Sequence, residues 1–294
     1  MTRPSVARLC AVAALAGGVI VSARQLQLPD EPARQFGTSV TGAFEGWFDN
    51  ADGSHTFLSG YLNRNRATEV DIPIGPNNHV DPGGPDMGQP THFLPGRQSG
   101  MFAMTVPKSV APNTRFTWTV TMNGETNVIP FTMKPEYNFS PFKDEAVGNT
   151  PPVLHLLTEN AAGIQGPVGA LSKAPSVTAS MAAGAQLAVW ADDDARYTSL
   201  TNAPMLRARP VVTMVWSQYR GPGKVTFDNA RPMLKTLAGG QVGQPYKGTA
   251  TTTAKFSAPG DYVVMATLND YSGPGGGGEG CCWTNGLVKI TVTP

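Results

Sequence analysis

The chain has 294 residues, of which 40% are hydrophobic and only 15% are charged, and its formal net charge is +1. This near-neutral balance excludes the broad basic surface that nucleic acid or an anionic membrane would attract. The 33 glycines and 26 prolines favour short strands joined by turns over long helices.

Residues 1–23 have the pattern of a secretory signal peptide. Arg3 and Arg8 give a basic start, Leu9–Val21 is an apolar run, and small residues follow at 22 and 23. The run is shorter than the roughly 20 residues that a membrane helix needs, so we expect export without a membrane span. The exported chain keeps 20 of its 22 basic residues against 21 acidic ones, a net charge of −1, in the periplasm or outside the cell.

Residues 36–139 are predicted to form a first β-sandwich domain. Phe116, Trp118 and Val120 alternate with threonines, which is the pattern of a half-buried strand. The Asn123-Gly124 pair that follows predicts a hairpin turn, and so does Asp52-Gly53 between two earlier runs. Residues 140–150 are polar and lack periodicity, so we expect a linker there.

Residues 150–294 are predicted to form a second all-β domain. Strand-like runs occupy 185–195, 209–227, 249–270 and 287–294, with turn signals at Gly221-Pro222-Gly223 and Pro259-Gly260. The run Leu154–Gly163 fits either a strand or a short helix. The expected fold class is therefore all-β, with two immunoglobulin-like sandwiches in tandem after the signal peptide.

Three phrases of the second domain resemble the PKD-like branch of immunoglobulin-fold modules: MVWSQYRGPGKVTF, ATTTAKFSAPGDYVVMATLND and LVKITVTP. The resemblance covers residues 150–294 and implies a β-sandwich with a binding or spacing role. Two insertions depart from the family pattern, at ARPMLKTLAGGQVGQPYKG and at GPGGGGEGCCW. The matching positions are Asp192, Asp193, Asp194, Trp216, Phe256, Pro259, Gly260 and Tyr262. Phrases of the first domain resemble uncharacterised bacterial exported proteins, which implies no function.

Period-2 alternation and a tyrosine after a Pro-Gly corner predict the core of the second sandwich. The residues expected to be buried there are Val212, Met214, Trp216, Tyr262, Val264, Ala266 and Leu268.

Catalytic motifs give little support for an enzyme. The sequence has no Gly-x-Ser-x-Gly elbow, no His-Glu-x-x-His and no phosphate-binding loop. One Gly/Pro-rich segment holds His79, Asp81, Asp86 and His92, whose imidazole and carboxylate groups are ligand types for zinc. The alternative is a long ordered loop, in which proline restricts the backbone and glycine permits the turns.

An acidic run raises the possibility of a Ca²⁺ site, the one cofactor that the sequence suggests. The run is Asp192, Asp193 and Asp194, and immunoglobulin topology places it at the same end as Asn269 and Asp270. A solvated acidic turn is the alternative.

Cys281 and Cys282 are the only cysteines left after removal of a signal peptide that contains Cys10. Export favours oxidation, which leaves a vicinal disulfide, two free thiols or a bond between chains. We expect the vicinal bond, and we expect it to form an apolar knob at a loop tip with Trp283 and Tyr271, on a contact surface shared with the acidic loop. The alternative is that Trp283 caps the sandwich core.

These patterns together predict a non-enzymatic exported protein that binds a protein partner or a cell-surface glycan through loops at one end of a sandwich. One alternative is an accessory subunit of an exported enzyme or an envelope assembly. A third hypothesis is a metal-dependent hydrolase that uses the His79–His92 segment.

Overall fold

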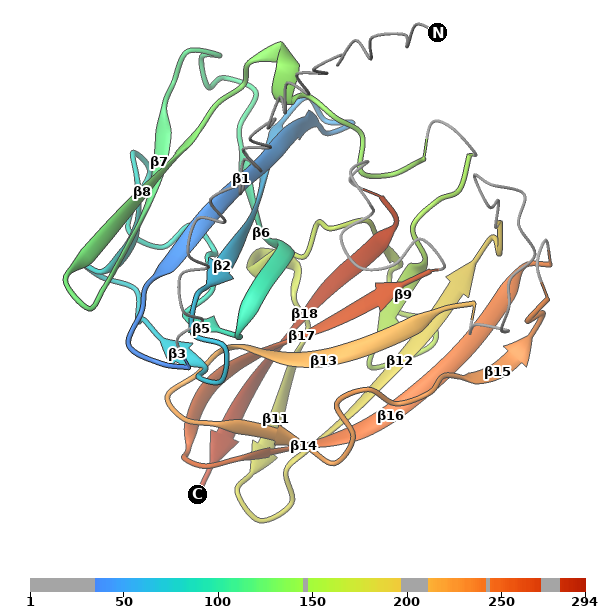
Figure 1. Cartoon of the computed structure of the whole chain (residues 1–294). Coiled ribbons are helices and arrows are strands. Elements are labelled where there is room, and N and C mark those ends of the chain that lie inside the picture. Colours follow the sequence, from blue (N-terminus) through green and yellow to red (C-terminus); the bar gives the residue numbers. More distant parts are fainter. Residues whose placement is uncertain (1–34, 145–147, 197–210, 242–243, 271–280) are drawn as a thin grey trace, which may run out of the picture. The chain divides into compact units, whose positions relative to one another are not determined.

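The computed structural model of the chain is described here for residues 35–144, 148–196, 211–241, 244–270 and 281–294 (Figure 1). These residues belong to one compact unit, Arg34–Pro294. The described part is all-β apart from two 3-10 turns, η1 (Pro135–Tyr137) and η2 (Leu171–Lys173), which confirms the predicted fold class. Residues 35–144 are called the first half below, and the described residues from 148 onward are called the second half.

The first half contains two three-stranded antiparallel sheets and a short two-stranded ladder. One sheet has the order β1-β2-β6, formed by β1 (Val40–Asp49), β2 (His55–Asn63) and β6 (Gly96–Val106). The other has the order β4-β7-β8, formed by β4 (Asn78–Asp81), β7 (Phe116–Met122) and β8 (Glu125–Phe131). The short pair consists of β3 (Val70–Asp71) and β5 (His92–Phe93).

The alternation in β7 sets the core of the first half. Phe116, Trp118 and Val120 are buried between the sheets, while the threonines between them are half-buried. The predicted hairpin to β8 is present, and both Asn123 and Gly124 have the positive φ that a tight hairpin turn requires.

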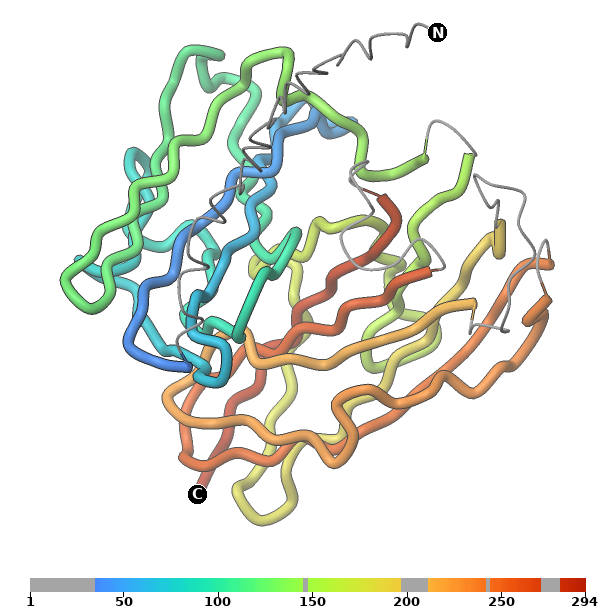
Figure 2. Tube along the Cα trace, viewed as in Figure 1, coloured from blue at the N-terminus to red at the C-terminus, as the bar shows by residue number. Residues whose placement is uncertain are grey.

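The second half is a sandwich of two sheets. One has the order β10-β9-β12-β16-β14, with β15 also paired to β16, and the other has the order β11-β18-β17-β13 (Figures 1 and 2). The strands are β9 (Val153–Leu156), β10 (Ile164–Gln165), β11 (Ser176–Ser180), β12 (Ala185–Asp193), β13 (Thr213–Arg220), β14 (Val225–Phe227), β15 (Lys235–Ala238), β16 (Tyr246–Phe256), β17 (Gly260–Asn269) and β18 (Trp283–Thr293). The run Leu154–Gly163, which fitted either a strand or a short helix, begins within strand β9.

This strand order is that of an immunoglobulin domain. Strands β9, β12, β16 and β14 take the places of the first, second, fifth and fourth strands of such a domain. Strands β13, β17 and β18 take the places of the third, sixth and seventh. The connectivity thus supports the immunoglobulin-like part of the resemblance.

The core of the second half is the one expected from the sequence. All seven predicted residues, from Val212 to Leu268, are buried in a single hydrophobic cluster. The Tyr262 hydroxyl donates a hydrogen bond to the Ala258 carbonyl at 2.8 Å, which is a tyrosine corner. The Tyr262 ring lies against Gly221, where any side chain would collide with it.

Each described sheet takes its strands from one side of residues 139–152, but the two halves share a core. Tyr219, Val263, Met265 and Leu287 of the second half belong to the hydrophobic cluster that includes Trp118 of the first. The division into two domains that fold independently stays a prediction.

Candidate functional site

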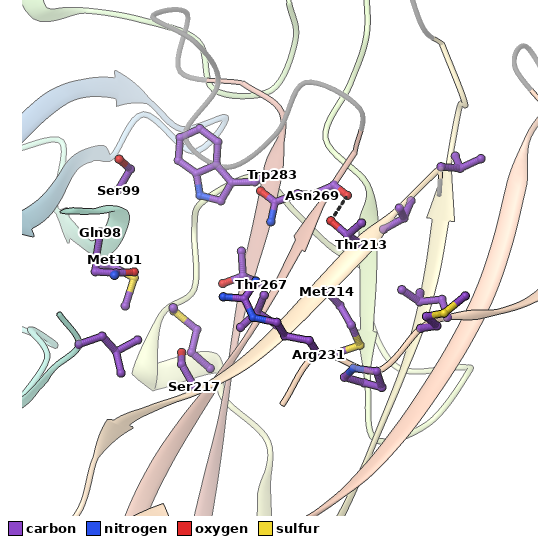
Figure 3. A pocket seen from close by; sticks show the side chains of 18 of the residues that line it. Gln98, Ser99, Met101, Thr213, Met214, Ser217, Arg231, Thr267, Asn269 and Trp283 are labelled. Carbon is purple, nitrogen blue, oxygen red and sulfur yellow. Dashed lines mark hydrogen bonds between the residues drawn. The ribbon is translucent and has the colours of Figure 1, made fainter. Parts of the chain in front are cut away.

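A cavity of about 990 Å³ is lined by residues of both halves (Figure 3). The first half contributes Leu94 and Pro95, which precede β6, and the beginning of β6 itself from Arg97 to Met101. The second half contributes β13 with the segment before it, the segment Arg231–Leu234, and side chains of β17 and β18. A space of this size suits a small ligand or a segment of polypeptide.

Four methionines line the cavity, out of eleven in the chain: Met101, Met214, Met233 and Met265. Three are buried, whereas Met233 is 87% exposed and is the most exposed large hydrophobic residue of the described part. Methionine side chains are flexible and polarisable, so a wall rich in them adapts to ligands of different shape. An exposed methionine at the mouth gives such a ligand apolar surface to cover.

Two buried polar atoms at the wall of the cavity have no hydrogen-bond partner among the described residues. They are the Trp283 indole Nε1, a donor, and the Asn269 Oδ1, an acceptor. Asn269 and Trp283 lie opposite each other on β17 and β18, and Figure 3 shows both on the same side of the cavity. A buried polar atom without a partner is costly, so these two atoms are suited to bind a ligand or ordered water.

The charges at the cavity are basic. Of the described residues that line it, none is Asp or Glu, while Arg97 and Arg231 are present. Glu45 lies behind Arg97 and accepts bonds from its guanidinium at 2.6 Å and from the Gly100 amide at 2.7 Å. Burial raises the pKa of Glu45 above its usual range, although Arg97 acts in the opposite direction. This pair holds the beginning of β6, which forms one wall.

The cavity also runs beside the free edge of a sheet. Among the described strands, β13 is the last of the order β11-β18-β17-β13, and the residues from Val211 to Val215 line the cavity. Two backbone groups of β13 already bond outside the sheet: the Trp216 amide donates to the Ala230 carbonyl at 2.8 Å, and the Tyr219 carbonyl accepts a bond from the Thr91 amide at 3.2 Å. An edge strand offers further backbone donors and acceptors to an extended chain.

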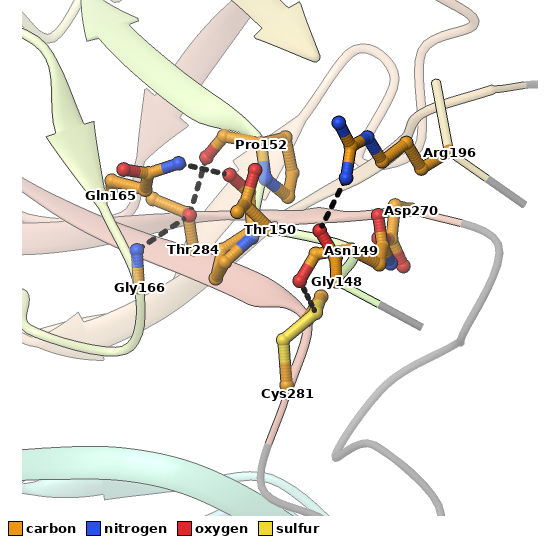
Figure 4. Close-up of a disulfide and its surroundings, with 12 residues drawn as sticks. Gly148, Asn149, Thr150, Pro152, Gln165, Gly166, Arg196, Asp270, Cys281 and Thr284 are labelled. Atoms are coloured by element: carbon orange, nitrogen blue, oxygen red, sulfur yellow. Dashed lines mark hydrogen bonds between the residues drawn. A yellow bond between two sulfur atoms is a disulfide. The ribbon is translucent and has the colours of Figure 1, made fainter. Parts of the chain in front are cut away.

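The structure joins Cys281 and Cys282 by a disulfide, across a cis peptide bond with the Cα atoms 3.1 Å apart (Figure 4). The expected exposed knob is wrong, because Cys281, Cys282 and Trp283 are all buried. The Trp283 ring packs against Gly100 of the first half, where a side chain would overlap with it. Sequence reasoning missed this contact because it joins residues far apart in the chain. Tyr271 lies outside the described residues.

The acidic run separates onto two faces because side chains alternate along β12. Asp192 faces outward, where it pairs with His155 at 3.3 Å and with Lys247 at 3.4 Å. Asp193 is buried on the inner face. Burial raises its pKa to about 7, and the like charges of Asp270 and Asp194 add to the shift. Asp193 at the end of β12 and Asp270 after β17 are therefore close enough for their charges to interact.

The structure does not bring together the four residues of the Gly/Pro-rich segment that were suggested for zinc. His79 pairs with Asp81 at 3.1 Å, and Asp86 binds Arg220. His92 is buried elsewhere, 2.8 Å from Asp71. No three His, Cys, Asp or Glu side chains converge on a metal position anywhere in the described ranges.

The same Gly/Pro-rich segment instead contacts the second half. The Arg220 guanidinium donates two bonds to the Asp86 carboxylate, at 2.8 and 2.9 Å, and two more to the Gln89 carbonyl. The Tyr219 hydroxyl donates to the Gly88 carbonyl at 2.7 Å. The alternative interpretation of this segment, a long ordered loop, therefore fits the structure. The loop also joins the two halves, a role that no sequence signal indicated.

Comparisons with known proteins give no family. Neither a scan of protein-family models nor a search of curated proteins finds a match. Among solved structures, the crystal structure of Rst D1-D2 shares 7% identity over 87% of this chain and 100% of its own, with a TM-score of 0.26. The D00-D0 domain of Intimin shares 11% identity over 86% of this chain and 99% of its own, with a TM-score of 0.24.

A third similar structure is dimeric latent PorU from Porphyromonas gingivalis. It shares 10% identity over 87% of this chain and 24% of its own, with a TM-score of 0.24. TM-scores this low carry no argument about function. In the described ranges, no helix is long and apolar enough to cross a membrane.

Proposed function

We propose that the chain is an exported, non-enzymatic binding protein whose cavity takes an extended apolar segment of a partner protein. The observation that carries the proposal is the position of the methionine-lined cavity along the free edge of β13. An extended peptide that adds to a sheet edge gains affinity from backbone hydrogen bonds and specificity from side-chain pockets.

Three further features support this proposal. The signal-peptide pattern of residues 1–23 favours export, which would bring the protein to a surface or periplasmic partner. The PKD-like resemblance of the second half implies binding or spacing. The Trp283 Nε1 and the Asn269 Oδ1, which have no hydrogen-bond partner in the described part of the chain, supply one donor and one acceptor to the ligand.

The accessory-subunit alternative uses the same site, with the segment supplied by an exported enzyme or an envelope protein. The hydrolase alternative has less support, because His79 and His92 pair with different carboxylates. A glycan ligand is a competing outcome of the experiment below.

A displayed library of random peptides, selected on the chain from residue 24 onward, tests the proposal. We expect the selection to enrich apolar sequences with strand propensity. The affinity of one enriched peptide is then measured by calorimetry for the wild-type chain and for two variants. Met233→Asp at the cavity mouth should weaken binding roughly tenfold, since a buried methionine is worth about 1.5–3 kcal/mol and tenfold is about 1.4 kcal/mol.

Val128→Asp is the matched control, because Val128 is also exposed and apolar but lies on β8, outside the cavity lining. It should bind the peptide like the wild type. Amide exchange should slow along β13 and stay unchanged in β11, the other end of the same sheet. The absence of a peptide consensus, or glycan binding that Met233→Asp abolishes, would contradict the peptide assignment.

A further inference from the structure

A second group of polar residues lies at the end of the second half, next to the cavity but outside its lining. Asp193 ends β12 and Asp270 follows β17, and Asn149 precedes β9. The three are 8%, 6% and 5% exposed. Figure 4 shows Asn149 beside Asp270, and the Asn149 Nδ2 donates a hydrogen bond to the Asp270 carboxylate.

Two oxygens of this group are buried and have no hydrogen-bond partner among the described residues. They are the Asp193 Oδ2 and the Asn149 Oδ1. The other Asp193 oxygen accepts a bond from the Ala195 amide at 2.8 Å. Burying an ionised carboxylate costs free energy unless it is paired with a positive group or coordinates a metal. The Asp193 Oδ2, which has no such partner among the described residues, is therefore suited to bind a cation.

Two basic side chains that the structure describes near this end bond to other groups. Arg196 donates to the Gly148 carbonyl at 3.4 Å, and Lys247 pairs with Asp192 on the outer face. None of the ion pairs found in the described residues involves Asp193. Among the described residues, the charges found to act on Asp193 are those of Asp270 and Asp194, which are negative.

We propose that Asp193, Asp270 and the Asn149 amide oxygen bind one Ca²⁺ ion at this end of the second half. Rotation of the Asn149 amide about its Cβ–Cγ bond turns Oδ1 toward the carboxylates, which is the orientation that a cation favours. Ca²⁺ accepts carboxylate, amide and backbone oxygens together with water, so it does not require a third carboxylate. The group contains no imidazole or free thiol, which zinc would prefer.

The structure selects among the residues that the sequence suggested for calcium. Asp192 is on the outer face of β12, and Asn269 faces the cavity. Asp194 stays close, with its carboxylate held by the Thr150 hydroxyl at 3.0 Å, and adds negative charge. Asn149 was not foreseen, because it lies in the segment interpreted as a linker.

Thermal melting and calorimetry of the chain from residue 24 onward, first treated with chelator, test the site with CaCl₂ as the probe. We expect binding heat and a rise in melting temperature with Ca²⁺. Asp193→Asn and Asp270→Asn should each weaken Ca²⁺ binding at least tenfold. Asp192→Asn is the matched control, one position away on the opposite face, and should bind Ca²⁺ like the wild type.

Two variants, Asp193→Asn and Asp270→Asn, are used so that the proposal can still be tested if one of them does not fold. Asn has nearly the shape of Asp and removes a buried charge, so both are expected to stay folded by circular dichroism. No heat and no shift in the wild type would overturn the site, as would a loss in Asp192→Asn equal to that in Asp193→Asn. A response to Zn²⁺ without one to Ca²⁺ would overturn the choice of ion. Met233→Asp should leave Ca²⁺ binding unchanged, which separates this test from that of the cavity.

Discussion

Replacing Arg220 by alanine tests the contact that joins the two halves. The Arg220 side chain is 15% exposed and makes charge-assisted bonds to the Asp86 carboxylate and bonds to the Gln89 carbonyl. Hydrogen bonds to charged groups contribute about 1.5–3 kcal/mol, and a buried acceptor left bare costs about 1–3 kcal/mol. Asp86 is half-exposed and regains water in the variant, which reduces the loss. We therefore expect Arg220→Ala to lower the free energy of unfolding by about 3 kcal/mol.

Urea denaturation followed by tryptophan fluorescence measures this change. The matched control is Lys255→Ala, which breaks an ion pair of 2.7 Å with Asp228 in which both side chains are more than half exposed. An exposed pair contributes about 0–1 kcal/mol, so the control should change little. The reasoning is refuted if Arg220→Ala costs no more than Lys255→Ala. Two unfolding transitions in Arg220→Ala, where the wild type has one, would support the predicted pair of domains.

The remaining predictions concern pH, the disulfide and the buried tryptophan. The Arg220 side chain lowers the pKa of Asp86, so its stabilising contribution should be complete above the usual Asp pKa of 3.8 and be lost as pH falls through the lower folded value. Melting temperatures of wild type and Asp86→Asn should therefore converge in acid; a constant difference down to pH 2 contradicts this. Intact mass of the unreduced chain should show no alkylation at Cys281 or Cys282, and uptake of label would mean free thiols. Trp283→Ala should cost about 3–5 kcal/mol in urea, as for other buried aromatic residues, whereas unchanged stability would argue against burial.

Much of the fold could be predicted from the sequence because its determinants are local. Alternation in residues 116–122 depends only on the two-residue period of a strand, and the Asn123-Gly124 turn depends on backbone conformations that these residues favour. The core of the second half followed in the same way from Trp216 and Tyr262, which belong to strand patterns and a corner motif. The proximity of Asp193 to Asp270 needed one more step, the topology of an immunoglobulin domain.

Tertiary structure alone decided the contacts between distant residues. The sequence predicted that Trp283 lies on a contact surface at a loop tip, but its side chain is buried and its ring packs against Gly100 of β6. It grouped His79 and His92 by proximity in the chain, but each pairs with a different carboxylate. Alternation separates neighbours such as Asp192 and Asp193, while folding brings residues such as Asp86 and Arg220, 134 positions apart, into contact. Proximity in the chain fixes neither outcome, because each depends on which surfaces pack together once water is excluded.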